Sequence, residues 1–135
     1  MEPYKHKINY YETDKMGVTH HSNYIRFMEE ARVHYMEQMG YSYDRMEEEG
    51  VICPVIAVSC NYKKSTTFPD VLTIHARIAE MGRMKMTITY VIERDGEVVA
   101  TGESKHAFLN ADGIPVSPMK ACPEFYEKAL AAMEE

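Results

Sequence analysis

The sequence predicts an α+β domain in which one antiparallel sheet is covered by a long amphipathic helix. Two hydrophobic periods lead to this prediction. Residues 22–40 repeat apolar side chains every three or four positions, as in a helix, whereas the segments after Val51 mostly alternate, as in strands. The predicted strands follow one another through tight turns, which is typical of an antiparallel sheet.

The first predicted elements are a strand and the long helix. Residues 3–10 alternate in hydrophobicity, and a polar stretch with Gly17 follows them. The helix begins near Ser22 or Asn23, either of which can cap it, and ends at Gly40. Its apolar stripe consists of Tyr24, Phe27, Met28, Ala31, Tyr35 and Met39. A short second helix is expected over residues 43–49.

The remaining elements are four strands and a final helix. The strands are expected over residues 56–62, 72–78, 84–92 and 98–109. Asp95-Gly96 between two alternating runs is a strong hairpin signal, and Asp112-Gly113 turns the chain again. Pro123 suits the first position of a helix that runs to about Met133.

Length and composition exclude several classes of protein. A chain of 135 residues, 45% hydrophobic and 27% charged, fits a single globular domain over residues 1–135. A net charge of −6 argues against nucleic acid as a partner, and the longest apolar stretch, residues 51–58, is too short to span a membrane. The N-terminus has no secretory signal, so we expect a cytoplasmic location. The three cysteines contain no CxxC pair and are expected to be free thiols.

The segment from Tyr11 to Tyr24 carries the candidate chemistry. Asp14 lies shortly before the start of the long helix, where unpaired backbone N–H groups and a partial positive charge can hold a developing oxyanion. A nearby carboxylate could attack a carbonyl held there or deprotonate a water molecule. The alternative for Asp14 is a loop cap or an Asx turn. These residues therefore allow acyl-transfer chemistry without requiring it.

This segment also resembles the first motif of the hotdog-fold acyl-CoA thioesterases, in the 4-hydroxybenzoyl-CoA thioesterase-like family. The matching residues are Tyr11, Asp14, Gly17, Val18, His21, Asn23, Tyr24, Arg26 and Phe27. Residues 65–72 and 100–118 are similar to later parts of the same family. The resemblance implies a hotdog fold, with a sheet of five to six strands wrapped around a long central helix. It also implies hydrolysis of acyl-CoA to a carboxylic acid and CoA without a cofactor.

The resemblance assigns roles to the residues of the motif. Asp14 matches the catalytic carboxylate, used as nucleophile or general base. The backbone N–H of His21 matches the group that polarises the thioester carbonyl, and its side chain matches a supporting histidine. Gly17 keeps the loop tight, and together with Val18 and Tyr24 it is expected to contact substrate. Position 20 is His where many relatives carry Tyr or Trp, which leaves the acyl-chain preference open.

Basic residues for the CoA phosphates are also suggested. The resemblance puts Arg83 at a phosphate contact in some members, and Lys85 is close to it in sequence. Lys63 and Lys64 are further candidates, and a solvated strand end is the alternative for these cations. The hydroxyl run at residues 65–67 either binds phosphate or forms a turn.

Assembly and two other functions complete the expectations. A single sheet with one covering helix leaves open edges, and members of this family pair their sheets, so we expect a homodimer or homotetramer with the active site between subunits. The alternatives are a non-catalytic acyl-thioester binding or sensing domain and a hotdog hydratase or dehydratase. For the latter, Glu29 and Glu30 lack the accompanying histidine signature. Adjacent side chains such as His20 and His21 point opposite ways on an extended segment, so no metal site is expected.

Overall fold

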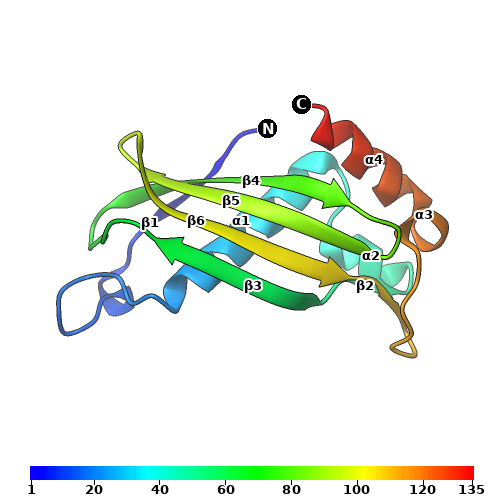
Figure 1. Ribbon diagram of the computed structural model, residues 1–135, viewed down its shortest axis with the longest axis horizontal. Helices are drawn as coiled ribbons and strands as arrows, with labels where there is room; N and C mark the ends of the chain where they lie inside the picture. Colours follow the sequence, from blue (N-terminus) through cyan, green and yellow to red (C-terminus); the bar gives the residue numbers. More distant parts are fainter.

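The computed structural model describes residues 1–135 and consists of a five-stranded antiparallel sheet packed on one long helix (Figure 1). In chain order the strands of this sheet are β1 (Tyr4–Lys7), β3 (Val55–Tyr62), β4 (Val71–Met81), β5 (Lys85–Arg94) and β6 (Glu97–Ala107). Their spatial order is β1-β4-β5-β6-β3. Two short strands, β2 (Val51–Ile52) and β7 (Leu109–Asn110), form a separate ribbon. The predicted α+β class is confirmed.

Four α-helices complete the fold: α1 (Asn23–Met39), α2 (Tyr43–Glu48), α3 (Pro118–Ala121) and α4 (Pro123–Met133). Of these, α1, α2 and α4 were predicted, and the short α3 was not. Helix α1 crosses one face of the sheet, and α4 packs beside β4 near the chain termini (Figure 1). None of the helices has the length and apolar character that crossing a lipid bilayer requires.

The predicted apolar stripe of α1 forms the centre of the core. All six of its residues are buried, within a cluster of 25 buried hydrophobic residues that also includes the inward side chains of β4 and β5. At one point a side chain of the helix packs directly on the backbone of the sheet. A Cβ at Gly102 would lie 2.8 Å from Sδ of Met28. Gly40 ends α1 in the left-handed conformation (φ 85°), as predicted.

The predicted first strand is too long. β1 ends at Lys7, and residues Tyr10–Glu12 form a 3₁₀ turn instead. The chain turns at Asn9, whose backbone N–H donates to the carboxylate of Glu12 at 2.7 Å. This turn leaves the side chain of Tyr10 77% exposed, although alternation predicted that it shares a face with buried Ile8. The local bond to Glu12 overrides the alternating pattern.

Strand β3 forms an edge of the sheet, and most of its side chains are exposed. Alternation places Ile56, Val58, Cys60 and Tyr62 on one apolar face; Cys60 packs against the core, whereas the other three remain 44–48% exposed. A β-bulge between Val55 and Ala57 shifts the pairing with β6. An exposed apolar edge strand has unpaired N–H and C=O groups and is a surface that another chain can cover.

A chain of buried polar groups links α1 to β5 and β6. Arg32 donates to the Tyr90 hydroxyl at 3.1 Å, and the Tyr90 hydroxyl contacts Oγ of Ser104 at 2.6 Å. Oγ of Ser104 in turn lies 2.8 Å from Nε2 of His106. Burial, and secondarily the charge of Arg32, lowers the pKa of His106 to about 4. His106 is therefore neutral inside the fold at neutral pH.

This lowered pKa predicts that the fold weakens in acid. Between pH 6.5 and about 4 the unfolded chain binds a proton at His106 that the folded chain does not, so the free energy of unfolding falls as pH falls. The total loss is on the order of 2–3 kcal/mol. Urea unfolding at pH 7, 5.5 and 4 should show a flatter pH dependence for His106→Gln than for wild type. The control is exposed His75→Gln, and equal pH dependence in wild type and His106→Gln would contradict this assignment.

Candidate active site

A pocket of about 400 Å³ opens beside the N-terminus of α1. Its walls come from the loop before α1, the first turn of α1, and the end of β3 with the residues that follow. The lining residues are Asp14, Met16, Val18, Thr19, His21, Tyr24, Tyr62, Lys63, Lys64 and Ser65. Four predicted site residues therefore meet in one place, namely Asp14, Val18, His21 and Tyr24.

The loop that carries Asp14 is closed by its own backbone. Thr13 and Thr19 form an isolated antiparallel bridge, and the Asp14 N–H donates to the Val18 carbonyl at 2.9 Å. Gly17 makes the return possible with a φ of 80°, and its N–H donates to the Asp14 carbonyl at 3.0 Å. Gly17 thus shapes the loop without lining the pocket.

The carboxylate of half-buried Asp14 is anchored at one oxygen. Its Oδ1 accepts the backbone N–H of Met16 at 2.8 Å, which is the Asx turn considered as an alternative role. Its Oδ2 accepts no hydrogen bond from the chain. The turn and a chemical role are therefore compatible, because one oxygen fixes the side chain and the other is free to react.

The start of α1 provides a free backbone donor. Ser22, at the N-cap position, already has helical angles and makes no capping hydrogen bond with its side chain, contrary to the prediction. Its Oγ instead contacts Nδ1 of His20 at 2.9 Å. The N–H of His21 donates to no acceptor in the chain, while its carbonyl accepts the Tyr24 N–H at 3.1 Å. The Ser22 N–H donates to Nδ1 of His20 at 3.2 Å, so the free donor at the start of α1 is the His21 N–H, which favours binding of a partial negative charge.

The imidazole of His21 lies outside the pocket's polar network. It is exposed, stacks on the ring of His20 with centroids 4.3 Å apart, and meets Tyr62 edge-on at 6.2 Å. No group of three or more His, Cys, Asp or Glu side chains is arranged to hold a metal ion. The group of His21 that can act in the pocket is therefore its backbone N–H.

A chain of buried hydroxyls lies behind the pocket, and the sequence did not reveal it. The Tyr24 hydroxyl contacts Oγ1 of Thr66 at 2.7 Å, and Thr66 donates to Oγ1 of Thr19 at the same distance. Burial raises the pKa of Tyr24 above its usual value, so the phenol stays neutral. Thr66 is 1% exposed, so this member of the hydroxyl run at residues 65–67 braces the loop and is inaccessible to a phosphate.

The predicted basic residues occupy two different ends of the sheet. Lys63 and Lys64 are on the rim of the pocket, where Lys64 pairs with Glu97 at 2.7 Å and Lys63 makes no ion pair. Arg83 and Lys85 are exposed at the turn between β4 and β5, at the opposite end of the sheet (Figure 1). β4 has 11 residues, so the two ends are about 35 Å apart. One chain does not bring Arg83 or Lys85 to Asp14.

Comparisons with known proteins agree with this geometry. The sequence profile described as "Thioesterase-like superfamily" matches residues 8–130. YneP, a Bacillus subtilis protein named for acyl-CoA thioesterase activity, is 31% identical over 128 residues, which are 91% of this chain and 93% of YneP. The long-chain acyl-CoA thioesterase FadM of Escherichia coli is 27% identical over 96 residues, which are 70% of this chain and 72% of FadM.

A solved structure shows the same architecture. The structure of a DHNA-CoA thioesterase from Staphylococcus aureus superposes with a TM-score of 0.93 at 30% sequence identity, covering 98% of this chain and 91% of that chain. The expected hotdog arrangement, with a sheet packed around a central helix, is thereby confirmed.

Proposed function

The chain belongs to the thioesterase-like superfamily and is a thioester hydrolase, and we propose that it hydrolyses acyl-CoA in the pocket at the start of α1. The observation that carries this proposal is that Asp14, with one anchored and one free oxygen, shares a pocket with the unpaired N–H of His21. A carboxylate and an oxyanion donor are the two groups that acyl transfer needs.

The proposed reaction uses these two groups in turn. The thioester carbonyl oxygen accepts the His21 N–H, and the partial positive charge at the start of α1 stabilises the oxyanion that develops there. In one route Oδ2 of Asp14 attacks the carbonyl carbon, the C–S bond breaks, and water hydrolyses the resulting anhydride. In the other route Asp14 takes a proton from water, the hydroxide adds to the carbonyl carbon, and that proton passes to the departing thiolate.

The other functions predict different products. A hydratase or dehydratase leaves the thioester bond intact, and a sensing domain leaves the ligand unchanged. Neither of the two candidate glutamates lines the pocket: Glu30 accepts the Tyr4 hydroxyl at 3.0 Å, and Glu29 is exposed. Identification of free carboxylic acid and free thiol across a panel of aryl and aliphatic acyl-CoAs decides among the three and defines the acyl preference.

Asp14→Asn should abolish most hydrolysis and leave the fold intact. The amide keeps an oxygen for the Met16 N–H but can act neither as nucleophile nor as base. We expect kcat to fall about 10²- to 10⁴-fold. Asp112→Asn in an exposed turn is the matched control, and initial rates of thiol release measure both. A kcat for Asp14→Asn within tenfold of wild type would refute the catalytic assignment.

We further propose that two copies of the chain pair through the exposed edge of β3. Antiparallel pairing of two β3 strands would bring the Val55 end of one copy beside the Tyr62 end of the other. In the resulting sheet, β5 of the second copy lies three strands away from β3 of the first. Lys85 of the second copy would then be about 15 Å from the pocket end of β3, compared with about 35 Å within one chain. The basic turn of one copy thus suits the pocket of the other.

The pairing predicts that a charge on β3 dissociates the protein. Val58→Lys should shift the mass measured by light scattering from at least twice 15.6 kDa toward 15.6 kDa, because a buried unpaired charge is costly. It should also lower kcat/KM for acyl-CoA. Val98→Lys, at a partly exposed apolar site on β6, is the control. A wild-type chain that is monomeric and active would contradict the proposed pairing through β3.

Lys63→Ala and Arg83→Ala should each weaken the use of acyl-CoA. One lost charge-assisted contact to phosphate corresponds to about a 10- to 100-fold lower kcat/KM. The matching acyl-N-acetylcysteamine, which lacks the nucleotide, should be unaffected. Equal losses on both substrates would mean that these residues support the fold or the chemistry instead.

Mixed dimers test whether Arg83 serves the other subunit. Asp14→Asn and Arg83→Ala chains, each impaired alone, are mixed and allowed to exchange subunits. If Arg83 acts across the interface, each hybrid dimer has one intact site, and about a quarter of wild-type activity returns. If Arg83 acts within its own chain, mixing restores nothing.

A further inference from the structure

Glu12 connects the Asp14 loop to the start of α1. Its carbonyl oxygen accepts two hydrogen bonds, from the His20 N–H at 2.8 Å and from Nδ2 of Asn23 at 2.9 Å. The loop from residue 13 to residue 19 therefore leaves and returns at Glu12. A displacement of Glu12 would move Asp14 and the His21 N–H relative to each other.

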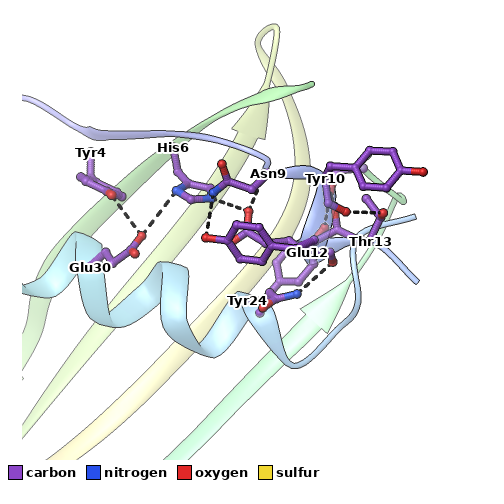
Figure 2. Close-up of polar contacts among 12 residues, drawn as sticks. Tyr4, His6, Asn9, Tyr10, Glu12, Thr13, Tyr24 and Glu30 are labelled. Atoms are coloured by element: carbon purple, nitrogen blue, oxygen red, sulfur yellow. Dashed lines mark hydrogen bonds and ion pairs between the residues drawn. The ribbon is translucent and has the colours of Figure 1, made fainter. Parts of the chain in front are cut away.

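The carboxylate of Glu12 is held in place in turn. The residue is only 6% exposed, and its Oε1 accepts the Asn9 N–H at 2.7 Å and lies 2.9 Å from Nε2 of His6 (Figure 2). A buried carboxylate is costly unless it is paired and hydrogen-bonded. These two donors therefore determine where Glu12 lies.

His6 joins Glu12 to the side of α1. Its Nδ1 lies 3.5 Å from Oε2 of Glu30, which also accepts the Tyr4 hydroxyl at 3.0 Å (Figure 2). Its ring packs on Phe27 with centroids 4.3 Å apart. The imidazole thus contacts Glu12 through Nε2, approaches Glu30 with Nδ1 and packs on Phe27 with one face.

We propose that His6 and Glu12 are positioning residues for the thioesterase reaction, which fix Asp14 and the His21 N–H at their productive separation. Neither residue lines the pocket, so they act through the Asp14 loop and do not touch substrate. The inference rests on the proposed function, because the separation between Asp14 and the His21 N–H matters only if these two groups carry out the reaction. Misplacement of a reacting group by about 1 Å can cost about 10²-fold in rate.

Two substitutions of His6 separate its two contacts. In His6→Gln the side-chain amide can still donate to Glu12 from near the position of Nε2. In His6→Asn the shorter amide reaches only the position of Nδ1, and Glu12 loses this donor. We expect kcat to fall about 10-fold or more for His6→Asn and for Glu12→Ala, which removes the oxygen that accepts both donors, with KM little changed. His6→Gln should stay close to wild type, as should the control Glu29→Gln on the exposed face of α1.

A second measurement does not depend on activity. Amide hydrogen exchange of residues 13–22 should be faster in His6→Asn than in wild type and in His6→Gln, at a temperature where all are folded. Unchanged kcat and exchange in His6→Asn, or equal damage by Asn and Gln, would overturn the proposal. If Glu12→Ala does not fold, His6→Asn decides, because it retains the carboxylate. If wild type hydrolyses no acyl-CoA, the proposed function fails, and the exchange data alone judge the positioning role.

Discussion

The packing of α1 against the sheet is the constraint on which the pocket depends. Met28 of α1 reaches over Gly102 of β6, where a Cβ would lie 2.8 Å from its Sδ. The helix itself packs mainly on β4 and β1, and because cores are tightly packed, these contacts set where α1 lies on the sheet. The start of α1, with the free N–H of His21, therefore lies beside the end of β3. The location of this N–H is a consequence of core packing as much as of the loop before the helix.

Periodicity predicted those elements whose burial is one-sided. The stripe of α1 and the alternation of β4 and β5 appear in the structure because one face of each is buried. The same reasoning failed for residues 8–10, since a bond between Asn9 and the Glu12 carboxylate bends the chain there. It also gave no sign that the apolar face of β3 is exposed. Alternation reports which residues share a face, and it does not report what covers that face.

The candidate site was predictable to the extent that it is local in sequence. Asp14, Val18, His21 and Tyr24 lie within eleven residues, and a single motif identified them together. Lys63 reaches the same pocket from the end of β3, and Thr66 bonds to Tyr24 behind it; only the fold reveals that proximity. The hydrogen bond between Thr66 and Tyr24 could not be predicted, because a run of Ser and Thr is equally typical of a turn. A linear motif also does not show whether Arg83 would serve the pocket of its own chain or that of a second copy.

The charge distribution connects assembly with substrate binding. The chain carries a net charge of −6, so its overall field repels a polyphosphate, and local cations must overcome that repulsion. On the rim of the pocket Lys64 is already paired with Glu97, which leaves Lys63 as the unpaired cation there. A single exposed lysine is a weak phosphate site, because its charge is screened by salt. The basic turn of a second copy would supply the missing charges. In the proposed pairing, the second copy would cover the apolar edge of β3 and bring these charges to the same place.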